Sequence, residues 1–252
     1  MREKFYKTYF KIEKEHWLMK VRRRVVFDVL HNVLEKNKES KILDFGCGSG
    51  ILVEELSSEG YKAFGVDVSR EAIRFGNSEG IKNIKVMASD KIDFPDNVFD
   101  VVTALDVLEH LENEKLSMKE IERVLKPGGV LIVMVPAYMF LWGVQDEVAH
   151  HYRRYTESSL LTVIKKSGCI LPFRTTYFNS FLFFPIAAVR LLSRALNLRN
   201  RESDFDINNV FLNKLFFAIF NLERILLKKI SFPFGVSILS VCKKSEKSGD
   251  LF

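Results

Sequence analysis

A short apolar segment that breaks into alternating glycines constrains the fold of this chain more than any other feature. Residues 41–45 (KILDF) have the composition of a buried strand, and glycines follow at Gly46, Gly48 and Gly50. Residues 51–56 then take up helical periodicity. Glycines allow a sharp bend and the close approach of a ligand, and a helix N-terminus presents unpaired N–H groups. The segment therefore predicts a strand, a ligand-binding turn and a helix.

A second strand with an acid at its end follows this unit. Residues 61–67 end in Asp67, where a carboxylate can accept hydrogen bonds from both hydroxyls of a ribose. The alternative is that Asp67 forms a turn or caps the helix that starts near Ser69. The dinucleotide fingerprint G-x-G-x-x-G/A does not fit, because Ile51 stands where the third small residue is needed.

The acid-x-Gly-x-Gly-x-Gly run from Asp44 to Gly50 resembles the first motif of the class I S-adenosylmethionine-dependent methyltransferases. Two further segments are typical of that family: residues 99–102 (FDVV) in the fourth strand, and residues 126–129 (KPGG) as a glycine stop between a helix and the fifth strand. The resemblance implies an α/β fold with a doubly wound, mostly parallel, seven-stranded Rossmann-like sheet. It also implies that the last strand lies antiparallel beside the fifth.

The resemblance further implies which residues hold the cofactor, S-adenosyl-L-methionine. Asp90, an acid after the third strand, would accept from the adenine amino group, and Lys91 would contribute through its backbone. A turn-forming role is the alternative for Asp90. The expected cofactor-binding residues are Asp44, Gly46, Cys47, Gly48, Gly50, Asp67, Val68, Asp90, Lys91 and Asp106.

Two motifs outside the core resemble a methyltransferase type 11/12-like subgroup that is associated with glycan and lipid biosynthesis. They are E-x-x-H-W at residues 13–17 and H-x-R-R-Y at residues 151–155. The resemblance implies that the N-terminal helical segment 1–38 covers the cofactor as a lid, so that an arginine of the run 22–24 meets the methionine carboxylate. The alternative is an amphipathic helix packed on the domain, with a solvated basic turn.

The acceptor side is expected beside the fourth and fifth strands, because ligands of doubly wound sheets collect at the carboxyl ends of strands. Residues 105–111 are expected to open a helix at the carboxyl end of the fourth strand. His110 and His151 are candidates for a general base near neutral pH, and Arg154 is a candidate clamp on a carboxylate or phosphate of the acceptor. The site is predicted to be metal-free. The alternative is a divalent metal held by Asp106, Glu109 and His110 with His150 or His151.

A sixth strand is predicted at residues 170–178. Two strongly apolar helices are predicted between it and the last strand, at residues 179–196 and 211–230, with a polar linker between them. Helices this apolar must be covered. They can cap the sheet, form a homodimer contact, line an apolar acceptor pocket, or dock on a membrane interface with the help of Arg190, Arg194, Lys228 and Lys229. The chain is interpreted as one domain, with the lid 1–38, the core 39–178, a helical insertion 179–232, the last strand 233–244 and a tail 245–252.

Composition limits the setting of the protein. The net charge of +6 favours anionic partners without choosing among them, and three cysteines without a C-x-x-C pair indicate reduced thiols in the cytoplasm. The charged N-terminus does not fit a signal peptide, and no apolar run reaches the length of a membrane span. These features predict a cytoplasmic protein, or one peripheral to the inner face of the membrane.

The sequence therefore predicts an S-adenosylmethionine-dependent methyltransferase that modifies oxygen or carbon of a small-molecule, lipid-linked or glycan-linked acceptor. Nucleic acid is not expected, because the Asn/Asp-Pro-Pro-Tyr/Phe turn of DNA adenine methyltransferases is absent. Two alternatives stay open. One is a cofactor-binding scaffold without turnover, and the other is an RNA methyltransferase, which rests only on the basic charge.

Overall fold

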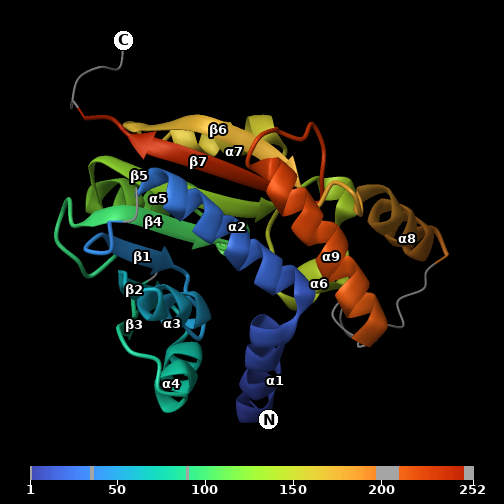
Figure 1. The fold of residues 1–252 in the computed structure, drawn as a ribbon, viewed down its shortest axis with the longest axis horizontal. Helices are drawn as coiled ribbons and strands as arrows, with labels where there is room; N and C mark the ends of the chain where they lie inside the picture. Colours follow the sequence, from blue (N-terminus) through green and yellow to red (C-terminus); the bar gives the residue numbers. More distant parts are fainter. Residues whose placement is uncertain (1, 35–36, 89–90, 197–209, 247–252) are drawn as a thin grey trace.

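Seven strands form one sheet, in the order β3-β2-β1-β4-β5-β7-β6, in the computed structural model, which describes residues 2–34, 37–88, 91–196 and 210–246 (Figure 1). The strands are β1 (Lys41–Phe45), β2 (Lys62–Asp67), β3 (Ile84–Val86), β4 (Phe99–Leu105), β5 (Leu125–Pro136), β6 (Ile170–Phe178) and β7 (Ser237–Lys244). Strands β1 to β5 are parallel, and β7 runs antiparallel between β5 and β6. The predicted fold class is confirmed, including the antiparallel last strand beside the fifth.

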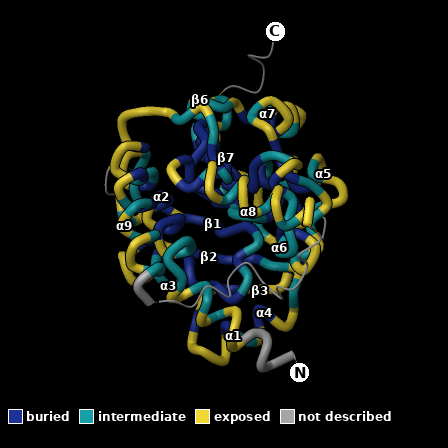
Figure 2. The backbone as a smooth tube through the Cα atoms, turned by 90° about the vertical axis from the view of Figure 1, so that its right-hand side faces the viewer, coloured by how far each residue is buried: buried dark blue, intermediate teal, exposed yellow. Residues whose placement is uncertain are grey.

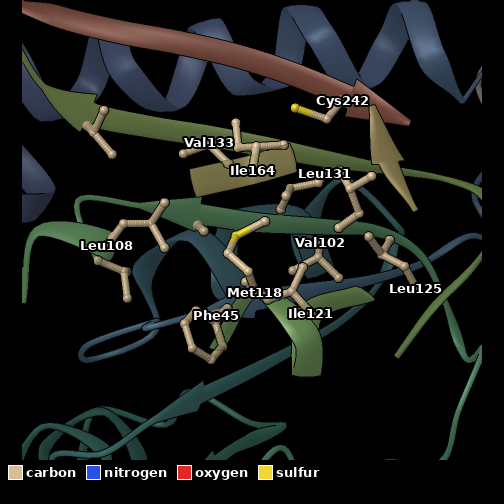
Figure 3. Packing of buried hydrophobic residues seen from close by; sticks show 14 of the residues in the cluster. Phe45, Val102, Leu108, Met118, Ile121, Leu125, Leu131, Val133, Ile164 and Cys242 are labelled. Atoms are coloured by element: carbon tan, nitrogen blue, oxygen red, sulfur yellow. The ribbon is translucent and has the colours of Figure 1, made fainter. Parts of the chain in front are cut away.

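Helices cover both faces of this sheet. They are α1 (Arg2–Glu15), α2 (Trp17–Val33), α3 (Ile51–Ser58), α4 (Arg70–Ser78), α5 (Glu114–Val124), α6 (Val144–Val148), α7 (Glu157–Lys165), α8 (Phe183–Ala195) and α9 (Val210–Leu227). Apolar residues of α2, α3 and α9 form the core on one face, and those of α5 and α7 form it on the other. Figure 3 shows Met118 and Ile121 of α5 packed with Phe45 and Val102 of the strands. Burial on both faces explains why the central strands are almost uniformly apolar.

The carboxyl ends of the parallel strands all meet at one edge of the sheet. This edge faces right in Figure 1, where α6 and α8 lie. Helix α9 lies beside α2 on the front of the molecule, and these two helices are in direct contact. The cofactor turn after β1 and the segments that follow β4 and β5 therefore share this edge with the helical insertion.

Three local predictions need correction. Residues 126–129, predicted as a glycine stop between helix and strand, lie within β5, because Leu125 pairs with Phe99 ahead of an irregularity in the β4–β5 register. The helix predicted to open at residues 105–111 is only a short 3-10 turn, Leu108–His110. The N-terminal segment is two helices that break at His16, which caps α2 by accepting from Leu18 N.

No residue of helix α8 is buried (Figure 2). Helix α9 buries Phe220, Glu223 and Leu227 and leaves Leu215, Leu222 and Ile225 exposed. Among the described residues, no helix combines the length and apolar character needed to cross a bilayer. The polar linker predicted after α8 and most of the predicted C-terminal tail lie outside the described residues.

Candidate functional site

The glycine-rich turn after β1 folds back on the end of β2. Gly46 N and Cys47 N both donate to Val66 O, at 2.8 and 3.0 Å. Gly46 and Gly48 have φ values of 76° and 54°, which favour glycine. A Cβ on Gly46 would lie 2.3 Å from Val107 Cγ2, whereas a Cβ on Gly48 would meet no atom within 4 Å. The backbone at Gly48 is therefore open to a ligand that lies flat against it.

Asp67 ends β2 opposite this turn. Its Oδ2 accepts from Gly48 N at 2.8 Å, and its Oδ1 accepts from Ser69 N at 2.7 Å. Helix α4 is capped by Ser69, whose Oγ accepts from Ala72 N at 3.1 Å. The carboxylate of Asp67 thus holds the glycine turn at the sheet edge, at the strand end where a ribose is expected.

Two expected cofactor residues lie beneath the turn. Asp44 is buried, and its Oδ1 accepts from Thr103 Oγ1 at 2.6 Å. Cys47 is a free cysteine, also buried. These side chains support the turn from the side of the sheet, so that contact with a ligand falls to the backbone above them.

Other expected cofactor residues surround the turn. Val68 is 54% exposed, an apolar side chain next to Asp67 on which a flat ring can lie. Lys91 is exposed, and its backbone forms an antiparallel β-bridge with Ala88. Asp90 lies outside the described residues.

The N-terminal helices place polar groups on the turn and at the end of β4. Ser49 Oγ donates to Glu13 Oε2 at 3.0 Å, and Arg23 Nη1 donates to Glu13 O at 2.6 Å. Arg22 Nη2 lies 2.5 Å from Asp106 Oδ1, with the Arg22 side chain only 10% exposed. Of the three arginines at residues 22–24, Arg22 is therefore the one that reaches the edge of the sheet where the parallel strands end, which we call the catalytic edge. The E-x-x-H-W motif at residues 13–17 gave no indication in the sequence that Glu13 would contact the glycine turn.

Two acids beside the glycine turn predict an unusual pH dependence: Asp44, which is buried, and Glu13, which is half-buried. Burial raises the pKa of Glu13 and of Asp44, each to about 7, and the carboxylate of Asp67 opposes their ionisation further. Hydrogen bonds favour the ionised forms, from Ser49 to Glu13 and from Thr103 to Asp44, but they do not outweigh burial. The folded chain therefore binds protons that the unfolded chain releases at lower pH.

The sign of the effect follows from linkage. Because both pKa values are raised on folding, the contribution of these two acids to the stability of the cofactor-free protein should be fully present below their ordinary pKa values of about 4 and should be lost as pH rises to about 7. Urea unfolding across this range should show the decline. Glu13→Gln should make it shallower, since a neutral amide takes no part in the titration. Unchanged pH dependence in Glu13→Gln would contradict this account.

Asp146, on α6, is the centre of the predicted acceptor side. Its Oδ1 accepts from Arg154 Nε and lies against His151 Nδ1, both at 2.8 Å, and its Oδ2 accepts from Gly143 N at 2.7 Å and Arg154 Nη2 at 2.9 Å. Burial alone would raise the pKa of Asp146, but the hydrogen bonds from His151 and Arg154 hold it at about 2. The Arg154 guanidinium is buried in this pair, so its predicted role as an acceptor clamp stays a prediction.

The structure brings the two predicted catalytic histidines together. The ring centroids of His110 and His151 are 4.5 Å apart, and the rings are nearly perpendicular at 86°. Glu109 is 0% exposed, and neither carboxylate oxygen has a hydrogen-bond partner among the described residues. Burial raises the pKa of Glu109 well above its ordinary value. Tyr152 N donates to Glu109 O at 2.8 Å, which joins the segment after β4 to the segment after α6.

Helix α8 contacts the segment between β5 and α7, residues 137–156, which we call the acceptor loop, through its basic residues. Arg190 Nη1 lies 3.6 Å from Asp146 Oδ2 and donates to Leu141 O, and Arg194 Nη2 donates to Trp142 O at 3.0 Å. From the sequence, both arginines were considered only for a membrane interface, one of four alternatives for these helices. Their spacing of four residues on an otherwise apolar helix was the signal that they share one face.

A glycine turn after β1, an acid at the end of β2 and an antiparallel β7 between β5 and β6 together define the class of S-adenosylmethionine-dependent methyltransferases. Residues 18–171 match a family of methyltransferase domains. This match covers more than half of the chain, so the protein belongs to that family, and S-adenosylmethionine is its cofactor. The open backbone at Gly48 fits this group, since the cofactor needs the close approach that a side chain would block.

Two relatives in sequence and one solved structure extend the comparison. The chain is 38% identical to sterol 4-C-methyltransferase strm-1 of Caenorhabditis elegans over 107 residues, 40% of this chain and 32% of that one. It is 23% identical to ubiquinone biosynthesis O-methyltransferase of Idiomarina loihiensis over 188 residues, 68% of this chain and 72% of that one. The match thus spans about a third of the nematode relative. A solved S-adenosylmethionine-dependent methyltransferase from Methanosarcina mazei shares the fold, with a TM-score of 0.57, 17% identity, and coverage of 87% of this chain and 98% of that one.

Proposed function

We propose that the protein transfers the methyl group of S-adenosylmethionine to an oxygen or carbon atom of an apolar small-molecule or lipid-linked acceptor. The names of two relatives support an apolar acceptor, since they act on a sterol and in the biosynthesis of ubiquinone. The observation that carries the proposal is the position of α8. This helix contacts the acceptor loop through Arg190 and Arg194 and leaves its large apolar side chains in solvent.

Each part of the site has a task in this proposal. When bound, the cofactor supplies an electrophilic methyl group on a sulfonium. Asp67 holds the ribose, the glycine turn supports the cofactor from below, and Arg22 receives the methionine carboxylate in place of Asp106. His110 and His151 lie on the acceptor side, where they contact the group to be methylated. Catalysis then depends on holding donor and acceptor collinear in a pocket that the N-terminal helices and α8 shield from water.

Helix α8 turns its basic residues toward the protein and leaves apolar residues exposed to solvent. Its two arginines point to backbone carbonyls of the acceptor loop, whereas Phe184 is 66% exposed and Leu192 is 59% exposed. Exposed lysines also flank the exposed apolar residues of α9, with Lys214 near the start of the helix and Lys229 just after its end. Apolar side chains bordered by lysines fit the interface of an anionic membrane. We therefore place a lipid surface against α8 and α9, from which an apolar acceptor reaches the site.

Replacing Phe184 and Leu192 together with serine should release the protein from vesicles of phosphatidylglycerol and phosphatidylcholine in a sedimentation assay. Each side chain contributes about 1.5–3 kcal/mol when transferred from water to an apolar environment, so the loss should exceed tenfold. Leu116→Ser on α5, which changes a leucine of 49% exposure, is the matched control and should bind like the wild type. Equal binding by the double variant, or a wild-type dimer that hides this surface, would rule the lipid contact out.

Product formation tests the activity itself. Release of S-adenosylhomocysteine should rise when a phenolic or hydroxylated isoprenoid is supplied in vesicles. It should not rise with a water-soluble compound that carries the same phenol or hydroxyl group without the isoprenoid chain. Cofactor binding without any turnover across such acceptors would favour a scaffold. Salt-sensitive RNA binding accompanied by RNA methylation would favour the RNA methyltransferase instead.

A further inference from the structure

The buried carboxyl group of Glu109 is not among the groups expected to hold the cofactor. Both of its oxygen atoms are buried and lack hydrogen bonds among the described residues. An ionised carboxylate in such a place costs several kcal/mol unless a cation compensates it. Imidazole nitrogens of His110 and His151 and a carboxylate oxygen of Glu109 all lie within 4.8 Å of one another.

The second nitrogen of each histidine is already engaged. His151 Nδ1 lies 2.8 Å from Asp146 Oδ1, which leaves Nε2 to take a ligand. Asp146 is itself held by Arg154 through two hydrogen bonds, so the His151 ring has a fixed orientation. His110 makes a hydrogen bond with the backbone of Ala149. Imidazoles that bind metals are typically oriented in this way, by a carboxylate or a carbonyl on the other ring nitrogen.

We propose that Glu109, His110 and His151 bind a divalent transition-metal ion such as zinc. Two imidazoles and one carboxylate form a donor set that suits these ions and leaves coordination positions open. With metal–ligand bonds of about 2.0–2.2 Å, the donor atoms would draw together by roughly 1 Å. Asp106, part of the set considered from sequence alone, is paired with Arg22, and His150 is not among the three clustered residues.

The proposed metal site reaches the protein surface through His110. His110 is exposed and Glu109 is buried, so the ion would sit between the protein interior and the catalytic edge. There it would coordinate the oxygen to be methylated and lower the pKa of that hydroxyl, which favours the nucleophilic anion. This role rests on the proposed methyl transfer, whereas the binding of the ion does not.

Metal binding can be measured without any acceptor. The full-length protein, treated with EDTA and dialysed, should bind one Zn²⁺ per chain by calorimetry and should develop visible absorption bands with Co²⁺. Glu109→Gln keeps the shape of the side chain, and His110→Ala changes an exposed residue, so at least the second variant should fold. Each variant should weaken Zn²⁺ binding by at least about tenfold, because loss of even a group that only supports a metal ligand has an effect of this size.

His31→Ala is the matched control, because it removes a histidine on α2 outside the cluster and should bind the ion like the wild type. Calorimetric binding of S-adenosylmethionine should be the same in His110→Ala and wild type. Zinc binding without methyl transfer would support the metal site and would contradict the proposed function. A wild-type chain that binds no ion, or binds it as well after His110→Ala, would overturn the site and would show that Glu109 is kept as the neutral acid.

Discussion

Replacing Asp67 with alanine should abolish detectable binding of S-adenosylmethionine in isothermal titration calorimetry. The carboxylate accepts from Gly48 N and Ser69 N, so it shapes the turn on which the cofactor lies. It is also the group that we place on the ribose hydroxyls. Hydrogen bonds to a charged group contribute about 1.5–3 kcal/mol each, and loss of two of them lowers affinity by at least about 100-fold.

Two variants separate loss of the contact from loss of the fold. Asp93→Ala removes an exposed carboxylate near the end of β3, and this variant should bind the cofactor normally. Asp67→Asn retains one acceptor oxygen and should bind with intermediate affinity. Thermal unfolding of Asp67→Ala should remain cooperative. If Asp67→Ala binds S-adenosylmethionine as tightly as the wild-type chain, the ribose does not lie at the end of β2.

The cofactor side of this protein could be predicted because its determinants are local. The turn at residues 46–50 and the strand before it are contiguous in sequence, and β6 spans the predicted Ile170–Phe178. Right-handed βαβ connections then bring the carboxyl ends of β1, β2 and β4 to one edge. A single sequence carries the information for both steps, so Asp67 could be placed opposite the glycine turn before its contacts were known.

The acceptor side depends on contacts between segments that are distant in sequence. Periodicity identifies the apolar face of α8 but does not show which face turns inward, and the contacts of Arg190 and Arg194 with the acceptor loop decide it. In the same way, the sequence presents Glu109 and His151 as members of separate polar segments. The clustering of these two residues depends on how the segment after α6 folds back on the end of β4.

Replacing Asp146 with alanine should lower the free energy of unfolding by about 3–5 kcal/mol, because it would leave a buried guanidinium without its counter-charge. Arg154, whose side chain is 5% exposed, donates two hydrogen bonds to Asp146 and would keep only its bond to Ala137 O, at 3.1 Å. The backbone N–H of Gly143 would also lose its acceptor. Urea unfolding of the metal-free protein measures the loss directly.

An exposed ion pair provides the comparison. Lys62 and Glu39 pair on the surface, with side chains 51% and 79% exposed, so Glu39→Ala should lower stability far less than Asp146→Ala. The double variant Asp146→Ala with Arg154→Met removes both buried charges and should recover part of the stability lost in Asp146→Ala. A cost for Asp146→Ala no larger than that of Glu39→Ala would mean that water reaches Arg154. The fixed orientation of His151, on which the metal site depends, would then lose its structural basis.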